Sequence, residues 1–267
     1  MKFAFSTLGC PEWSWEDMLA TAKDLGFDGI EVRGMENELY VPKAKPFLPA
    51  NMADTKSRLE RMNIEIPCLT SSCCLFDKSK IGFYIDEGKH YIDLASDLEA
   101  PFIRVLGDRN PEPDENIDKG FVIENLSILG EYAASKSVKV LIETNGVFAK
   151  SEEIIRAIQK TCCNNVGVLW DVHHPFRYMN EPVAETYDAL KNYIQFVHIK
   201  DSVVHNGTVK YKMMGYGDVP VMEALQLLKA DGFEGFVSLE WVKRWCMDLE
   251  EPGVVFSHFI NYVKQVT

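Results

Sequence analysis

The sequence predicts an α/β protein built as a closed (β/α)8 barrel. Eight short apolar runs, rich in β-branched residues, alternate with longer helical patterns, and their starts lie about 26 to 40 residues apart. That interval holds one strand, one helix and two loops. The runs lack strict polar alternation, which is typical of parallel strands covered on both faces. They are Phe3–Leu8, Gly29–Val32, Ile64–Leu69, Phe102–Leu106, Val138–Ile142, Val166–Trp170, Phe196–Ile199 and Phe236–Leu239.

The segments between the runs carry helix signals. Ser14 and Ser151 are expected to cap two of the helices, because two acidic residues follow each within three positions. Gly26 is expected to end the first of these helices. Apolar residues recur at helical spacing, as in Met18, Leu19, Ala22 and Leu25; Ile154, Ile155 and Ile158; and Val221, Ala224, Leu225 and Leu228.

Eight strand–helix units in 267 residues are what a closed barrel requires. No Ser/Gly-rich linker or shift in composition divides the chain, so we expect one domain, residues 1–267. A doubly wound open sheet is the alternative. It is disfavoured because the first run is not followed by the glycine-rich signature of a dinucleotide-binding sheet.

Composition and charge exclude several classes of protein. The formal net charge is −12, which disfavours non-specific nucleic-acid binding, so no nucleic-acid partner is expected. No apolar run approaches the roughly 18 residues of a membrane span, and the stretch before Cys10 is too short for a signal peptide. The 7 cysteines form no Cys-x-x-Cys motif, which indicates free thiols in a reducing cytoplasm.

Four of the apolar runs lead into a potential metal ligand, and these residues are Glu143, Asp171, His198 and Glu240. In a barrel the carboxyl ends of the strands converge on one site. A buried carboxylate is costly unless it is paired or bound to a metal. Four converging groups with few cations to match them therefore predict one divalent ion. Three carboxylates and one imidazole suit Mn²⁺, the expected ion, with Mg²⁺, Co²⁺ and Zn²⁺ as alternatives.

Short motifs recur in a characteristic order along almost the whole chain. They are Leu25-Gly26-Phe27-Asp28-Gly29-Ile30-Glu31, Ile142-Glu143-Thr144-Asn145, Trp170-Asp171-Val172-His173-His174, Val197-His198-Ile199-Lys200-Asp201, Gly215-Tyr216-Gly217-Asp218 and Ser238-Leu239-Glu240-Trp241. In this order the chain resembles the sugar isomerase and epimerase family with the xylose isomerase-like TIM barrel. That family includes ketose 3-epimerases, inosose isomerases and dehydratases, hydroxypyruvate isomerases and, more distantly, endonuclease IV.

The resemblance implies roles for particular residues. It places the family's metal ligands on the same four residues, and it makes His174, in the Asp-x-x-His motif, a substrate contact. Lys212 stands where the family has an arginine that binds a substrate oxygen before the glycine turn, so the resemblance makes Lys212 a substrate contact that lacks the bidentate fork of arginine. The endonuclease branch needs extra histidines that are absent from residues 70–73, 104–107 and 209–211, which argues against DNA cleavage.

The implied chemistry is proton transfer next to a carbonyl group. A metal ion would stabilise the enediolate of a small sugar or polyol ketone, while Glu143 and Glu240 act as acid and base. Two bases on opposite faces give epimerisation, and one base serving two carbons gives isomerisation. A dehydratase acting on an inosose-like or dehydroshikimate-like substrate is one alternative, and a non-catalytic sugar-binding barrel is another. The sequence leaves open whether the chain forms a homo-oligomer.

The sequence allows two roles for each of two cationic residues, Lys200 and Arg104. Lys200 follows His198 by two positions, so it is expected on the same side, where it either binds a substrate hydroxyl or phosphate or pairs with Asp201 or Glu240. Arg104 lies inside the fourth run, where it forms either a substrate contact or a buried ion pair.

Two neighbouring pairs complete the expectations. Glu31 and Arg33 are expected to form a local ion pair. Of the adjacent His173 and His174, only one is expected to face the metal, and we favour His174.

Overall fold

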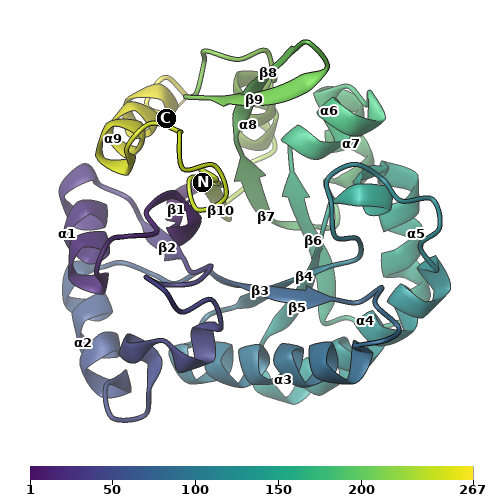
Figure 1. The fold of residues 1–267 in the computed structure, drawn as a ribbon, viewed down its shortest axis with the longest axis horizontal. Helices are drawn as coiled ribbons and strands as arrows, with labels where there is room; N and C mark the ends of the chain where they lie inside the picture. Colours follow the sequence, from purple (N-terminus) through teal and green to yellow (C-terminus); the bar gives the residue numbers. More distant parts are fainter. Residues whose placement is uncertain (267) are drawn as a thin grey trace.

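Eight parallel strands lie side by side in the computed structural model, which describes residues 1–266, in the order β2-β1-β10-β7-β6-β5-β4-β3. Parallel bridges from Gly29 to Glu65 and from Val32 to Leu69 join β2 to β3, so the sheet curls into a nearly closed barrel (Figure 1). The predicted (β/α)8 barrel is confirmed, and the open-sheet alternative is wrong. The barrel strands are β1 (Lys2–Ser6), β2 (Gly29–Glu31), β3 (Cys68–Cys74), β4 (Phe102–Leu106), β5 (Lys139–Glu143), β6 (Val166–Asp171), β7 (Ile194–Ile199) and β10 (Phe236–Leu239).

Helices surround the barrel (Figure 1). They are α1 (Trp15–Leu25), α2 (Met52–Met62), α3 (Ile81–Leu98), α4 (Lys119–Ala133), α5 (Ser151–Thr161), α6 (His173–Met179), α7 (Val183–Leu190), α8 (Val221–Ala230) and α9 (Pro252–Val263). Ser14 caps α1 as predicted and forms a capping box with Asp17, and Gly26 ends the helix at a φ of 81°.

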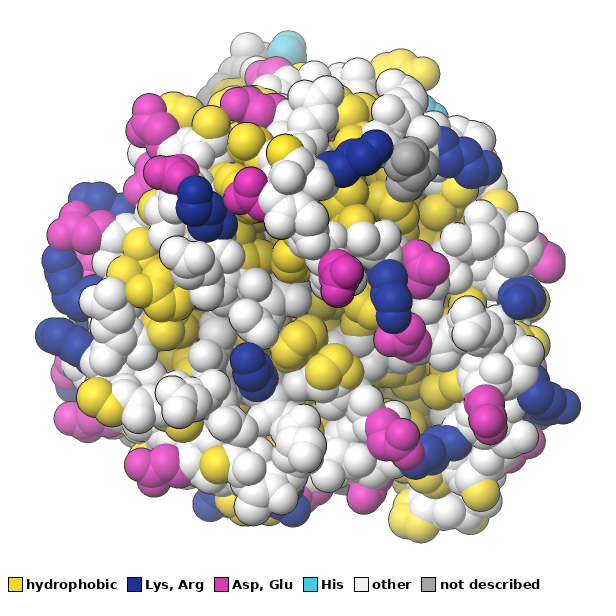
Figure 2. Space-filling view, turned by 180° about the vertical axis from the view of Figure 1, so that it is seen from behind, with side chains coloured by type: hydrophobic (Ala, Val, Ile, Leu, Met, Phe, Trp, Pro, Cys, Tyr) yellow, Lys and Arg dark blue, Asp and Glu magenta, His cyan; other side chains and the backbone are white. Residues whose placement is uncertain are grey.

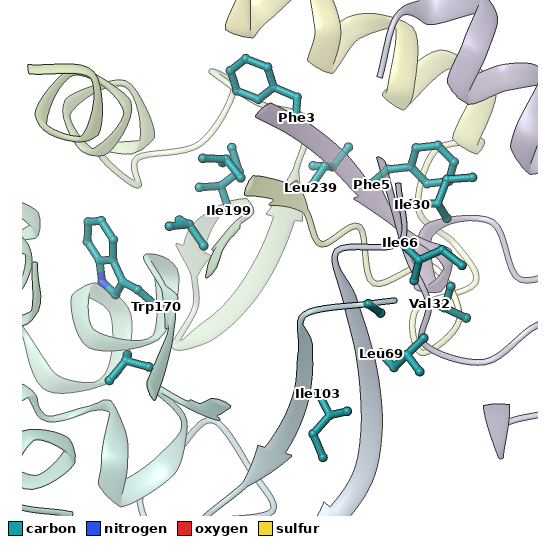
Figure 3. Packing of buried hydrophobic residues seen from close by; sticks show 14 of the residues in the cluster. Phe3, Phe5, Ile30, Val32, Ile66, Leu69, Ile103, Trp170, Ile199 and Leu239 are labelled. Carbon is teal, nitrogen blue, oxygen red and sulfur yellow. The ribbon is translucent and has the colours of Figure 1, made fainter. Parts of the chain in front are cut away.

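Alternate residues of each strand face opposite sides of the barrel wall. Outward side chains such as Phe3, Phe5 and Ile30 pack in the layer between strands and helices (Figure 3). Phe5, for example, stacks on Phe256 of α9 with ring centroids 4.3 Å apart. The inward side chains at the amino ends of the strands form a separate apolar cluster that fills the barrel, made of Ala4, Cys68, Leu141, Leu169, Phe196 and Phe236.

Three strands differ from the predicted runs by two residues or more at an end. The strand β7 begins at Ile194 instead of Phe196, and β3 ends at Cys74 instead of Leu69. The first strand ends at Ser6, because its side chain accepts from the Leu8 N–H and opens a 3₁₀ turn over Thr7–Gly9. The third strand begins at Cys68 rather than Ile64, since Pro67 has no N–H for the ladder. The stretch before Pro67 still follows β2, because the N–H of Ile30 donates to the Glu65 carbonyl at 2.9 Å.

The predicted cap of the fifth helix is also wrong. Ser151 is the first residue of α5 instead of its N-cap, and the capping position is taken by Lys150, whose side chain makes no capping bond. The Ser151 hydroxyl donates to the Glu181 carboxylate, which also accepts from the Ser151 N–H at 3.1 Å. A glutamate distant in sequence thus occupies the helix N-terminus.

An antiparallel hairpin was not predicted from the sequence. It consists of β8 (Asp201–His205) and β9 (Thr208–Lys212) and follows β7 directly. The carboxylate of Asp201 accepts backbone N–H groups from Ser202, Gly215, Gly217 and Val219 at 2.8–3.2 Å. Asp201 therefore fixes the glycine turn after the hairpin beside the carboxyl end of β7.

The outer surface carries mixed charges. On the face opposite to that of Figure 1, lysine and arginine side chains are interspersed with acidic ones (Figure 2). No helix among residues 1–266 combines the length and the apolar character that a membrane crossing requires.

Candidate active site

Polar side chains fill the carboxyl-terminal half of the barrel interior. Glu143 ends β5, Asp171 ends β6, His198 lies in β7 and Glu240 follows β10 directly. Each of these side chains points into the barrel, because it lies an even number of residues after an apolar residue of the barrel cluster on the same strand. Glu143, for example, lies two residues after Leu141. The ligand atoms of Glu143, His198 and Glu240 all lie within 4.8 Å of one another. The fold therefore brings three of the four residues that the sequence indicated into one group, and Asp171 lies beside them, with Oδ2 4.0 Å from Nδ1 of His198.

Asp171 uses its two oxygens differently. Its Oδ1 accepts the N–H groups of His173 and His174 at 2.9 and 3.2 Å, so it starts α6. Its Oδ2 lies 4.0 Å from Nδ1 of His198 and accepts from the ammonium of Lys200. The side chain is thus held by the helix while one oxygen faces the centre of the barrel.

His198 is oriented by a carboxylate that sequence reasoning assigned elsewhere. Its Nε2 lies 2.9 Å from Oε1 of Glu31, and Glu31 also accepts from the hydroxyls of Thr70 and Ser238 at 2.5 and 2.6 Å. The expected ion pair between Glu31 and Arg33 is therefore wrong. Glu31 ends β2, so the same rule of a polar residue at a strand end could have found it.

The ionisable side chains around His198 shift one another's pKa values. Burial opposes a charge on His198, but the carboxylates of Glu31 and Glu240 outweigh it and raise the pKa of His198 to about 9. Burial likewise opposes ionisation of Glu31, and His198 more than compensates, so the pKa of Glu31 lies below its usual range. Glu31 is therefore ionised, so it can only accept hydrogen bonds, and the hydrogen in its contact with His198 belongs to Nε2 of His198. The other ring nitrogen, Nδ1, faces the carboxylates of Asp171 and Glu240.

Lys200 completes the centre of the cluster. Its ammonium donates to Asp171 and to Glu240, and its side chain is almost fully buried. Burial acts against a charged Glu240, but Lys200 and then His198 hold the pKa of Glu240 well below its usual range. Of the two readings offered by the sequence, the structure shows the pairing with Glu240 and adds Asp171.

Arg104 forms a buried ion pair on the opposite side. Its Nε lies 3.0 Å from Oε2 of Glu143, and its Nη1 donates to the Ser71 carbonyl at 2.9 Å. Burial raises the pKa of Glu143 to about 7, although Arg104 acts in the other direction. The two glutamates thus differ in environment, since Glu240 is held ionised while Glu143 titrates near neutrality.

The adjacent histidines face different neighbours. His174 places Nδ1 3.5 Å from Glu143 and Nε2 3.7 Å from Asp171, and its Nδ1 hydrogen bonds to the Thr144 carbonyl at 3.0 Å. Burial, followed by the charge of Lys200, lowers the pKa of His174, which keeps it neutral. His173 instead bonds through Nε2 to the Ser202 hydroxyl at 2.9 Å.

Lys212 does not join the cluster. Its side chain is exposed on β9, where it pairs in register with Asp201. Tyr211, one residue earlier, faces the site instead, since its ring lies 5.8 Å from that of His173. Because side chains alternate along a strand, Tyr211 and Lys212 lie on opposite faces of the hairpin. The hairpin was not predicted from the sequence, so the sequence could not place these two side chains.

The donor set fits a divalent cation. Ligands about 2.1 Å from one ion lie no more than about 4.2 Å apart. Nδ1 of His198 is buried, has no hydrogen-bond partner and lies 3.6 Å from Glu240 and 4.0 Å from Asp171. Oδ2 of Asp171 and Oε2 of Glu240 also accept from the ammonium of Lys200, so an ion would share these two carboxylates with Lys200. Asp171, His198 and Glu240 could therefore share such an ion. Glu143, whose ligand atom lies within 4.8 Å of those of His198 and Glu240, could join them after a shift of its side chain.

Comparison with known proteins places this arrangement in a family. Fructoselysine 3-epimerase of Shigella flexneri is 24% identical over 268 residues, which cover 94% of this chain and 93% of that protein. The probable 3-DHS dehydratase AsbF of Bacillus anthracis superposes with a TM-score of 0.81 at 16% identity, over 99% of both chains. The IolI protein with a bound zinc atom superposes with a TM-score of 0.80 at 20% identity, over 100% of this chain and 98% of that one.

The relatives with a named activity are enzymes, so the alternative of a non-catalytic binding barrel is set aside. A family model for the xylose isomerase-like TIM barrel matches residues 19–256. The chain is therefore an enzyme that belongs to the xylose isomerase-like TIM barrel family.

Proposed function

We propose that this enzyme is a divalent-metal-dependent isomerase or epimerase of a sugar or related polyol ketone. The observation that carries the proposal is the placement of Glu143 and Glu240. Their strands, β5 and β10, are separated by β6 and β7, yet their carboxylates converge on the same imidazole, that of His198. Two carboxylates that approach a common centre from different strands can act on two faces of one carbon atom.

In this proposal Glu143, Asp171, His198 and Glu240 hold one divalent ion. The expected ion is Mn²⁺, although the zinc of the IolI protein keeps Zn²⁺ among the alternatives. When bound, the ion supplies positive charge that favours the enediolate form of the substrate. The three carboxylates and the imidazole supply the oxygen-rich ligand set that such ions prefer.

The proton transfers fall to the two glutamates. Glu240 is held ionised by Lys200, so it is in the form that can accept a proton from the carbon next to the carbonyl group, while its low pKa makes it the weaker base of the two glutamates. Burial raises the pKa of Glu143 to about 7, which suits a group that gives and takes a proton near neutral pH. Each glutamate serves one face in epimerisation, and a single one serves both carbons in isomerisation.

Three further side chains are proposed to contact the substrate. Lys200 and Arg104 carry positive charge beside the glutamates and would stabilise negative charge on a substrate oxygen. His174 is neutral, with Nδ1 bonded to the Thr144 carbonyl, so its Nε2 is free to accept from a substrate hydroxyl. We leave Lys212 out of this set because its side chain is exposed on β9.

The proposal also covers the cellular compartment, the domain organisation and the oligomeric state of the enzyme. All 7 cysteines are unpaired in the structure, which supports a reducing compartment, and we propose the cytoplasm. Residues 1–267 act in this proposal as one catalytic domain on a small-molecule substrate. A homo-oligomer is compatible with this proposal, and the mass of the enzyme in solution tests it.

The test follows protons and products together. The full-length enzyme loaded with Mn²⁺ is incubated with ketoses and inososes in deuterated water, and the carbon-bound protons are followed by NMR. We expect deuterium next to the carbonyl group and the appearance of an epimer or isomer. A product with the ultraviolet absorption of an enone would identify a dehydratase instead. Absence of exchange with every substrate, at full metal occupancy, would overturn the proposed chemistry.

A further inference from the structure

A buried arginine outside the metal-ligand set lacks a counter-ion. Arg33 follows β2 and is 8% exposed. Its Nη2 donates to the Ser72 hydroxyl at 2.7 Å, whereas its Nη1 is buried without a hydrogen-bond partner. None of the ion pairs within residues 1–266 includes Arg33. A buried guanidinium without a counter-ion is costly, so this group is poised for an anion.

The position of Arg33 relates it directly to the active site. The hydroxyl of Thr70 donates to Glu31 at 2.5 Å. Two residues later on each of these two strand segments, Ser72 accepts a hydrogen bond from Arg33. The guanidinium therefore lies beyond Glu31 toward the carboxyl ends of the strands. The backbone of Arg33 is fixed there, because its N–H donates to the Thr7 hydroxyl at 2.8 Å.

The surroundings of Arg33 are positive. Arg104 donates to the carbonyl of Ser71, the residue before Ser72. Burial, and then repulsion by Arg104, lowers the pKa of Arg33. Arg244 contributes further repulsion, and its own Nε and Nη2 are also buried without partners. The nearby carboxylate of Glu87 is engaged by the Ser72 N–H at 2.8 Å. Glu87 attracts Arg33 but forms no ion pair with it, and Arg104 is paired with Glu143, so no carboxylate within residues 1–266 contacts the Arg33 guanidinium directly.

We propose that Arg33 binds an anionic group of the substrate, either a carboxylate or a phosphate. This inference rests on the proposed function, and it names the substrate class as a sugar or polyol ketone that carries an acid group. The planar guanidinium suits both anions, because it offers paired N–H donors with fixed geometry. The ring of Trp245, which is half exposed, stands 5.9 Å from the guanidinium and covers one of its faces. The unpartnered Nη1 is the donor that an anion would take.

Binding of three probes to the full-length enzyme loaded with Mn²⁺ tests the inference. The probes are D-fructose, D-fructose 6-phosphate and the carboxylate 5-keto-D-gluconate, and affinity is measured by titration calorimetry. We expect at least one charged probe to bind about tenfold or more tightly than D-fructose, as charge-assisted hydrogen bonds predict. A preference for the 6-phosphate identifies a phosphate site, and a preference for the ketogluconate identifies a carboxylate site.

Variants then assign the effect to Arg33. Arg33→Met should remove the advantage of the charged probe and leave D-fructose binding unchanged, whereas Arg156→Met, at an exposed arginine of α5, should change neither. Arg33→Lys keeps the charge but loses the paired N–H donors, so it should lose part of the advantage. If the methionine variant does not fold, an undiminished advantage in Arg33→Lys overturns the anion site. Equal affinity for all three probes, or a charged-probe advantage that survives both Arg33 variants, overturns the anion site.

The two proposals fail separately. If the charged probe binds through Arg33 but no ketose exchanges protons with deuterated water, the anion site stands and the proposed chemistry is wrong. If exchange occurs with neutral ketoses and Arg33 has no effect on any probe, the proposed chemistry stands and the anion site is wrong.

Discussion

Nε2 of His198 donates to Oε1 of Glu31 across 2.9 Å, and both side chains are fully buried. Thr70 and Ser238 donate to the same carboxylate, so Glu31 cannot rotate without losing three hydrogen bonds. This contact fixes the imidazole plane and leaves Nδ1 directed at Asp171 and Glu240. A carboxylate that holds the second nitrogen of a metal-ligating histidine is a recurrent feature of metal sites.

The first prediction concerns Glu31. Glu31→Gln keeps the size of the side chain but removes its charge, so it should weaken Mn²⁺ binding about 10- to 100-fold. Titration calorimetry with Mn²⁺ measures the effect. Glu65→Gln, at an exposed glutamate paired with Lys2, is the matched control and should bind Mn²⁺ normally. If Glu31→Gln melts at a lower temperature yet binds Mn²⁺ like wild type, Glu31 has only a structural role.

The second prediction separates metal binding from helix capping at Asp171. Asp171→Asn keeps an oxygen that can accept the N–H groups at the start of α6 but removes the charge from the ligand set. We expect about one Mn²⁺ per wild-type chain and a strong loss of metal in the variant, with little change in helical content. Elemental analysis and circular dichroism measure the two effects. Full metal content in Asp171→Asn and Asp171→Ala would remove Asp171 from the ligand set.

The third prediction concerns the division of labour between Glu143 and Glu240. Each Glu→Gln variant removes one base while keeping an oxygen donor, so an epimerase should lose about 10²- to 10⁴-fold in turnover in either case. In deuterated water, the base that remains should still exchange one epimer and not the other. A single-base isomerase gives another pattern, in which one variant is inactive and the other exchanges both substrates. Near-normal turnover in both variants would leave these glutamates as metal ligands only.

The fourth prediction concerns the turn that Asp201 holds. A Cβ on Gly217 would lie 2.0 Å from Oδ1 of Asp201 and 2.5 Å from the Ser202 carbonyl. Gly217→Ala should therefore lower the free energy of unfolding by about 1–3 kcal/mol, as overpacking does. Gly82→Ala, in α3, meets no atom within 4 Å and should raise stability by about 0.5–1 kcal/mol. Urea unfolding of both variants checks the sign, and equal stabilities would show that the turn can shift.

The alternation of apolar runs and helical patterns along the sequence predicts most of the fold. Runs such as Val138–Ile142 and Phe236–Leu239 coincide with strands or lie within one residue of them, because a strand buried on both faces must be continuously apolar. The third strand was misplaced because Ile64 and Ile66 are apolar without lying in the ladder, and only the pairing with β2 shows where Pro67 interrupts it. The hairpin β8–β9 was not predicted because its strands are largely exposed and lack the continuous apolar run of the barrel strands.

The sequence by itself determined the barrel and the convergence of Glu143, Asp171, His198 and Glu240, because strand register and the parallel direction of the strands follow from local patterns. Tertiary structure decided which charges meet. Glu31 pairs with His198, 167 residues away, instead of its neighbour Arg33, and Lys200 bridges Asp171 and Glu240. Such contacts depend on closure of the sheet, which sets distances between strands that no spacing along the chain encodes. Closure also leaves Arg33 buried without a counter-ion, although its charge alone predicts a surface residue.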